Sequence, residues 1–449
     1  MNSYFLKTTH TAPLAIYRIA IGLMLFISIL RFWIKGWICE LYIKPLHFFS
    51  FYGFEFVKPL GNYTYVLFFV CAIAALMVAF GLFYRTAIVM LFFSFTYIEL
   101  MDRTTYLNHY YFMSLVLFIL IFLPAHRYFS IDAKRRPSIL SDQIPQWNID
   151  VLKLMMVILY FYAGLAKINS DWLLSALPLK IWLPSRNDLP IIGTLLSYQA
   201  TAFLFSWFGC LYDLTIAFLL WNRRTRLLAY LTVVVFHVLT AILFPIGMFP
   251  YVMIVAALIF FSADFHLRII DFLNKLFKCP PTFIRPNVRF TFKPAVQKVM
   301  LIGFALFFLV QLIFPFRYML YPGELFWTEE GYRFSWRVML MEKAGYAQFT
   351  IKDATGNFAV ANNNEFLTVL QEKMMSTQSD MILQYAHILR DYYAKKGFKS
   401  PQVYVDSYVA LNGRGGKVFI NPHVDLAKES DSFSTKMWIL PMNDEIEGF

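Results

Sequence analysis

The stretch VILYFYAGLAKINSDW, residues 157–172, decides how this chain is interpreted. It is an apolar and aromatic run that ends at Lys167, with Asp171 and Trp172 close behind. A lysine near the end of a membrane helix often extends its ammonium group to the lipid headgroups. The alternative is a functional site, because an ionisable side chain at bilayer depth is costly and usually marks one. The rest of the chain decides between these two interpretations of Lys167.

The composition indicates an integral membrane protein. Of the 449 residues, 59% are hydrophobic and 15% are charged, whereas a soluble domain has about 45–50% apolar and about 25% charged residues. The formal net charge is +12, but the lysines and arginines lie in short loops between apolar runs. This is typical of membrane topology and not of nucleic-acid binding. The four cysteines predict neither a metal site nor a disulfide framework, and no removable signal peptide is expected.

Nine apolar stretches approach the length of a membrane helix, which is about 20 residues. They are 13–30, 63–83, 86–101, 106–124, 149–167, 200–221, 226–244, 246–263 and 296–316. Residues 31–62 mix aromatic and charged side chains and predict an interfacial re-entrant loop or amphipathic helix. Basic residues gather on alternate loops, which predicts a cytoplasmic N-terminus. Lys167, the loop with His109 and the turn after His237 then all lie at the outer face.

The composition changes after residue 316, and no later apolar run is long enough to span a membrane. The predicted elements are strands in WRVMLMEK (336–343) and YAQFTIKD (346–353), a turn at Thr355-Gly356-Asn357, helices over 364–397 broken near Ser376, and a hairpin of QVYVDSYVAL and GKVFINP. We therefore predict two domains. Residues 1–316 form an all-α polytopic membrane domain of about nine transmembrane helices, and residues 317–449 form a small extracytoplasmic α+β domain.

Lys167 and His109 are the first candidates for chemistry. Burial disfavours the charged ammonium, so a desolvated Lys167 would be a competent general base. The aromatic helix end that includes Tyr162 can provide dry surroundings, whereas Asp171, four residues on, could pair with the ammonium and keep it charged. His109 follows Asn108 in TYLNHYYF. It is either a hydrogen-bonded residue of the aromatic belt or a neutral imidazole that polarises a substrate oxygen.

His237 and Asp213 lie within apolar runs, in VVVFHVLTAILF and CLYDLTIAF. A histidine inside a membrane helix faces the protein interior, often a cavity, and a carboxylate there is costly unless it is paired or protonated. Either residue could instead fix helix packing through a satisfied hydrogen bond. The eight histidines do not cluster at metal spacing, and nucleotide, hydrolase and metalloprotease motifs are absent. The residues alone predict an outward-facing polar site without a metal, in an enzyme for a membrane-soluble substrate or in a transporter.

Several stretches together carry a family resemblance. They are YFYAGLAKINSDW (160–172), LMDRTTYLNHYYF (100–112), AHRYFSIDA (125–133) and FHVLTAILFPIGMFPYVM (236–253), with LYDLTIAFLL (211–220) in support. As a set they resemble the vitamin K-dependent γ-glutamyl carboxylase family and its bacterial relatives with the horizontally transferred transmembrane (HTTM) domain.

The resemblance implies a reaction and its participants. Vitamin K hydroquinone, or menaquinol, would be the co-substrate with O2 and CO2, and no metal would be needed. A lysine deprotonates the quinol, O2 adds, and the strong base that results removes a γ-proton from a peptide glutamate, which takes up CO2 while the quinone leaves as its epoxide. By position, the resemblance implies Lys167 and His109 as catalytic residues and Asn108, His237, Asp213 and Tyr162 as residues that bind quinone or substrate.

The resemblance also implies partners and a location. Besides the lipid bilayer and the quinone, a glutamate-containing peptide or protein would be the substrate. The protein would be a multi-pass protein of the bacterial cytoplasmic membrane, or of the ER membrane in a eukaryote, with the C-terminal domain in the periplasm or lumen. Ala166 stands where vertebrate members carry a second lysine. The alternatives are a relative that epoxidises or binds quinone without protein carboxylation, and a transporter or receptor-like membrane protein.

Overall fold

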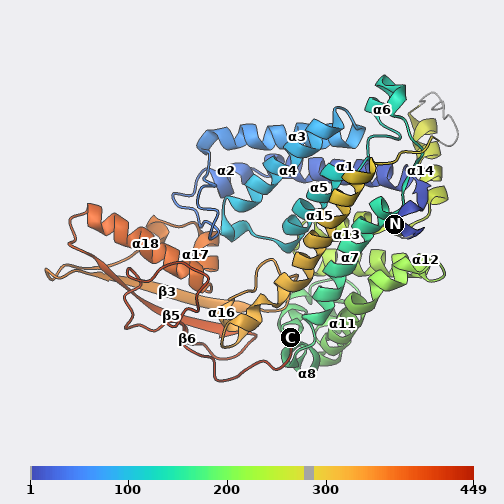
Figure 1. Ribbon diagram of the computed structural model, residues 1–449. Helices are drawn as coiled ribbons and strands as arrows, with labels where there is room; N and C mark the ends of the chain where they lie inside the picture. The colour runs from blue at the N-terminus through green and yellow to red at the C-terminus, as the bar shows by residue number, and fades with distance from the viewer. Residues whose placement is uncertain (1–2, 278–287) are drawn as a thin grey trace.

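The structure, a computed structural model, describes residues 3–277 and 288–449. Helices fill most of the first 320 residues, and an antiparallel sheet with two covering helices follows (Figure 1). The longer helices of the first part are α1 (Ala12–Ile34), α3 (Thr64–Phe80), α4 (Tyr84–Leu100), α5 (Asn108–Phe122), α7 (Trp147–Leu165), α11 (Gln199–Trp221), α12 (Arg226–Leu243), α13 (Phe249–Ala256), α14 (Ala263–Leu276) and α15 (Pro294–Ile313). Shorter elements are α2 (Trp37–Tyr42), α6 (Ile131–Arg135), α8 (Ser170–Ser175), α9 (Leu179–Trp182), α10 (Gly193–Leu196), and the paired strands β1 (Thr8–His10) and β2 (Gln143–Pro145).

Two glycines let pairs of membrane helices approach closely. A Cβ atom at Gly22 of α1 would lie 2.7 Å from the Ala75 carbonyl oxygen of α3. At Gly164, near the end of α7, a Cβ would lie 2.6 Å from the backbone nitrogen of Leu214 on α11. Small residues at such crossings let helix backbones pack together in a membrane. The contact at Gly164 brings the end of α7 against the middle of α11.

Each of the nine predicted apolar stretches contains a helix, but nine spanning helices is too high a number. Within the described residues, six helices are long and apolar enough to cross a membrane: Ala12–Ile34, Gly61–Phe80, Trp147–Leu165, Gln199–Trp221, Arg226–Leu243 and Pro294–Leu320. A seventh span is possible only if Phe249–Phe260 and Ala263–Leu276, which meet at a bend of 116°, are taken as one. The amphipathic helix α14 was not anticipated.

Helices α4 and α5, which correspond to the third and fourth predicted spans, are short and are joined by an ordered loop. Helix α4 has 17 residues and α5 has 15, fewer than the about 20 that a straight span needs. Between them the Asp102 carboxylate accepts a hydrogen bond from the Thr104 amide at 2.9 Å and begins a 3-10 turn. The apolar pattern left residues 102–105 outside both predicted spans, and the structure places the turn there; α5 begins at Asn108, two residues later than predicted.

The C-terminal part is an α+β unit. Its antiparallel sheet has the strand order β4-β3-β5-β6. Helices α17 and α18 both contact β3, and α18 also contacts β5. The elements are α16 (Leu325–Thr328), β3 (Lys343–Lys352), β4 (Phe358–Val360), α17 (Val369–Met375), α18 (Ser379–Lys395), β5 (Gln402–Leu411) and β6 (Lys417–Val418). The predicted strand YAQFTIKD, the turn at 355–357, the helix break near Ser376 and the β5–β6 hairpin are all confirmed.

The predicted strand WRVMLMEK is wrong. Only its last residue, Lys343, lies in a strand, and the preceding residues are irregular. Trp336 and Met339 have positive φ angles, +61° and +52°, which an extended strand does not allow. The Trp336 side chain is fully buried and stacks on Tyr111 of α5, with ring centroids 4.8 Å apart. Packing against the membrane helices therefore overrides the alternating pattern.

The two parts of the chain share apolar packing. Trp336 belongs to the apolar cluster of the membrane helices, whereas Trp172 of α8 belongs to the cluster of the C-terminal sheet. The predicted domain boundary after residue 316 falls within the 3-10 helix Phe314–Leu320 and stays a prediction, as does the orientation of the chain in the membrane.

Candidate functional site

Lys167 lies just beyond the C-terminal end of α7. Its amide donates to the Gly164 carbonyl oxygen at 3.0 Å, which closes the last turn. Its side-chain Nζ donates to the Ala163 carbonyl oxygen at 3.1 Å. A cation at this end of a helix is favoured, because the last carbonyl groups have no partner within the helix. The ammonium is therefore directed back along α7 instead of outward to solvent, and Lys167 is only 6% exposed.

The charge partner of Lys167 is Asp213, in the middle of α11. The Lys167 Nζ and the Asp213 Oδ2 atoms are 2.8 Å apart, and Asp213 is 7% exposed. The Lys167 ammonium also lies 5.2 Å from the ring centroid of Trp172. A buried ion pair keeps two charges together in a site of low dielectric, where either one alone would be costly. The close approach of α7 and α11 at Gly164 makes this contact possible.

Asp171, the neighbouring carboxylate in sequence, is not the partner of Lys167. Its two oxygens accept hydrogen bonds from Arg414 Nη1 and Nη2, both at 2.7 Å, and it is 3% exposed. Helix α7 ends at Leu165 and α8 begins at Ser170. The spacing of four residues between Lys167 and Asp171 is therefore not a helical spacing, and the alternative that Asp171 keeps the ammonium charged is wrong.

His237 of α12 is linked to α7 and α11 through the hydroxyl groups of two tyrosines. Its Nε2 atom is 3.1 Å from the Tyr160 hydroxyl, which is 3.5 Å from the Tyr212 hydroxyl. Its Nδ1 atom has no hydrogen-bond partner among the described residues. His237 also packs against the edge of Phe249, with ring centroids 5.5 Å apart. The imidazole is thus held at Nε2, while Nδ1 is a buried nitrogen without a partner among the described residues.

A cavity joins these groups. The empty volume within the cavity and its mouth is about 710 Å³. Its polar lining is formed mainly by Lys167, Asp213, His237 and Tyr160, and its walls are largely apolar and aromatic: Leu159, Trp172, Leu179, Trp182, Phe205, Phe236, Phe244, Ile246 and Phe249, with Val338 and Met339 from the C-terminal part. A mostly apolar cavity with a few convergent polar groups is suited to a small, largely apolar ligand.

The remaining predicted residues lie around the cavity and do not line it. His109, at the start of α5, packs against Phe249, which also contacts His237; the ring centroids of His109 and Phe249 are 5.8 Å apart. Asn108 donates to the Arg337 carbonyl oxygen at 2.9 Å. The Tyr162 hydroxyl donates to a carbonyl group of α15, and Tyr162 borders a separate small hollow. The structure thus brings Lys167, Asp213 and His237 together at the cavity, and the Phe249 ring lies between His237 and His109.

Sequence reasoning missed Tyr160 and Tyr212 as hydrogen-bonding groups near the site. Tyr160 and Ala163 lie on one face of α7, since residues three apart on a helix are neighbours, and they line the cavity with Lys167, which lies just beyond the helix end. Tyr162 projects from another face. Applying this periodicity to the quoted stretch would have separated Tyr160 from Tyr162. Across the described ranges, no group of three histidine, cysteine or acidic residues could hold a metal ion.

Two family models match the chain. The model described as the HTTM domain matches residues 6–265, and the model described as the vitamin K-dependent gamma-carboxylase lumenal domain matches residues 296–445. No solved structure matches the chain.

Proposed function

Because this chain, with its several candidate membrane spans, belongs to the vitamin K-dependent gamma-carboxylase family, we propose that it couples quinol epoxidation to the carboxylation of glutamate in a peptide. The observation that carries the proposal is a buried Lys167 amine at the wall of an apolar cavity. Vitamin K hydroquinone or menaquinol would supply, together with O2, the base that removes a γ-proton from the glutamate, and CO2 adds at that carbon.

The residues of the cavity fit a quinol. The aromatic walls suit an apolar ring, and the polar groups at one side suit its hydroxyl groups. In this role Lys167 takes the hydroxyl proton, so its amine must first be neutral. Asp213 can accept the lysine proton across 2.8 Å. Because this transfer converts an ion pair into a neutral pair, it changes no net charge in a dry site, where an isolated charge would be costly.

The other site residues would orient the substrate. His237, held by Tyr160, presents its free Nδ1 atom as a hydrogen-bonding group toward the second polar end of the ligand. We assign His109 a supporting role across the Phe249 ring, and Asn108 and Tyr162 the role of fixing the surrounding backbone. The C-terminal part, which contributes Val338 and Met339 to the cavity wall, would face the periplasm or lumen and receive the peptide.

Epoxide formation by purified protein tests this assignment. Protein in lipid nanodiscs would be supplied with vitamin K hydroquinone and O2, and the epoxide measured by chromatography. We expect Lys167→Ala to abolish epoxide formation. Lys180→Ala is the matched control, since Lys180 packs on Phe203, with Nζ 4.4 Å from its ring centroid, and does not line the cavity; it should retain activity. Full activity of Lys167→Ala would rule out the assignment.

Labelled CO2 separates the two halves of the proposed reaction. Incorporation into a glutamate-containing peptide would support the carboxylase. Epoxide without incorporation would support the alternative, a quinone-epoxidising relative that does not carboxylate protein. Absence of epoxide from the unmodified protein, with any quinone tested, would favour a binding or transport role.

A further inference from the structure

The segment that follows Lys167 is fixed by the C-terminal part of the chain. Asp171 accepts hydrogen bonds from both terminal nitrogens of Arg414 and, at 2.7 Å, from the side-chain amide of Asn412. Both donors lie in the loop that joins β5 to β6. A planar guanidinium facing a carboxylate with two parallel hydrogen bonds fixes orientation as well as distance. The β5–β6 loop is therefore clamped onto the first turn of α8.

Residues 446–449 hold the same segment from a second direction. The Ser170 amide donates to the Glu447 carbonyl oxygen at 2.8 Å, and the Phe449 amide donates to the Ile168 carbonyl oxygen at 2.9 Å. Between them Gly448 has a φ of +124°, and a Cβ atom there would lie 2.3 Å from the Ile168 oxygen. Only glycine fits this close approach. The backbone immediately after Lys167 is thus paired with a distant segment.

Trp172 links the clamped segment to the lysine amine. It follows Asp171 in α8, its ring centroid is 5.2 Å from the Lys167 Nζ atom, and it is 4% exposed. Its indole nitrogen donates to the Ser206 carbonyl oxygen of α11 at 2.8 Å, and α11 also carries Asp213. A displacement of α8 would therefore move the aromatic surface beneath the ammonium and change its distance to Asp213.

We propose that Arg414 is a positioning residue for Lys167, acting through Asp171 and helix α8. Its other carboxylate partner is Asp444, whose Oδ2 atom is 2.6 Å from Arg414 Nε. The side chain of Asp444 is 58% exposed, whereas that of Asp171 is 4% exposed. Removing one partner of an exposed pair costs little, whereas leaving a buried carboxylate without its partner costs much more, so the contact with Asp171 is the one that fixes geometry. The assignment of a positioning role rests on the proposed function of Lys167 as a base.

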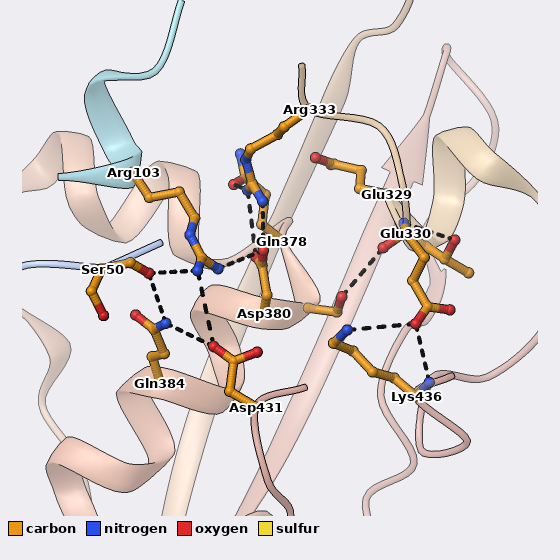
Figure 2. Close-up of polar contacts among 12 residues, drawn as sticks. Ser50, Arg103, Glu329, Glu330, Arg333, Gln378, Asp380, Gln384, Asp431 and Lys436 are labelled. Carbon is orange, nitrogen blue, oxygen red and sulfur yellow. Dashed lines mark hydrogen bonds and ion pairs between the residues drawn. The ribbon is translucent and has the colours of Figure 1, made fainter. Parts of the chain in front are cut away.

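A second contact of the same kind holds the loop that leads to His109. Figure 2 shows Arg103 from that loop directed at Asp380 and Asp431, with Arg333 sharing Asp380. The Arg103 Nη1 and Asp380 Oδ2 atoms are 2.5 Å apart. The C-terminal part therefore fixes the backbone beside both predicted catalytic residues. If this part receives the peptide, as proposed above, it is linked through these contacts to the segments beside Lys167 and His109.

The test measures the reactivity of the Lys167 amine as well as the rate of epoxidation. The full-length protein in nanodiscs would be prepared with Arg414→Ala, Arg414→Lys and Asp444→Asn. Amide hydrogen exchange of residues 168–176 reports the clamp, and labelling of Lys167 by an amine reagent across pH reports its proton affinity and access. We expect Arg414→Ala to raise exchange by about 10-fold or more. It should also shift the pH profile of labelling and lower kcat for epoxidation by about 10-fold, with KM nearly unchanged.

The two other variants keep the test decisive. Arg414→Lys retains the charge but not the paired hydrogen bonds, so it should fall between the unmodified protein and Arg414→Ala; it also serves if the alanine variant does not fold. Asp444→Asn, the matched control, should resemble the unmodified protein. Raised exchange with an unchanged labelling profile would show a merely structural clamp and overturn the proposal, as would no change at all. Labelling needs no turnover, so a protein without epoxidase activity still tests the clamp.

Discussion

Replacing Asp213 by asparagine would leave the Lys167 ammonium in a buried site without its carboxylate partner. The pair is 2.8 Å long, and its side chains are 7% and 10% exposed. What remains near the ammonium is the Ala163 carbonyl oxygen at 3.1 Å and the Trp172 ring at 5.2 Å. Removing one member of a buried ion pair costs about 3–5 kcal/mol. Because asparagine still offers a neutral acceptor, we expect a somewhat smaller loss, about 2–4 kcal/mol.

Removing both charges should cost much less. In Lys167→Met combined with Asp213→Leu, neither side chain has to be desolvated as an ion, and such apolar replacements are often neutral or stabilising. The double variant should therefore lie within about 1–2 kcal/mol of the unmodified protein, well below the sum of the single effects. This non-additivity distinguishes an ion pair from two independent packing residues.

Thermal unfolding in detergent, followed by tryptophan fluorescence, measures these differences. A domain of 150–250 residues shifts its Tm by roughly 2–4 °C per kcal/mol, and a larger chain by less, so Asp213→Asn should melt about 3–8 °C lower. Asp188→Asn is the control, because Asp188 is 73% exposed and lies 3.9 Å from Arg186; its effect should be below about 0.5 kcal/mol. Equal melting of Asp213→Asn and the control, or strict additivity in the double variant, would refute the reasoning.

Three further predictions concern the cavity wall, helix packing and the stability of the protein in acid. At Gly209, on the cavity wall, a Cβ would meet only a ring atom of Trp172 at 3.8 Å, so Gly209→Leu should fold but raise the KM for quinol. At Gly164 a Cβ would meet the Leu214 backbone at 2.6 Å, so Gly164→Ala should lower the free energy of unfolding by about 1–3 kcal/mol. Burial would raise the pKa of Asp380, but the guanidinium groups of Arg103 and Arg333 outweigh it and hold that pKa well below its usual range. Its contribution is therefore complete above about pH 5 and declines as pH falls below the unfolded-state value of about 3.9, and Asp380→Asn should flatten this acid dependence of stability in denaturant titrations.

The helices could be predicted from apolar runs because a membrane helix satisfies its own backbone and needs little else. The same pattern did not predict the 3-10 turn at Arg103–Thr105, because that turn begins with a hydrogen bond from the Thr104 amide to the Asp102 carboxylate. It also failed at Trp336, whose positive φ of +61° follows from burial against α5. The first feature depends on a local side-chain hydrogen bond, and the second on a contact with a distant segment.

In the candidate site, too, the sequence alone could not identify the partner of a charged residue. Lys167 has one carboxylate four residues away in sequence, Asp171, and another 46 residues away, Asp213. The distant one forms the ion pair, and the near one binds Arg414. Once α7 ends before Lys167, sequence spacing no longer indicates spatial contact. Under the proposed function these two carboxylates would have different tasks: Asp213 would exchange a proton with the amine at the cavity, while Asp171, bound to Arg414, would fix the helix that carries Trp172. A single carboxylate could not do both, because a proton acceptor must be able to become neutral, whereas an anchor for Arg414 must stay charged.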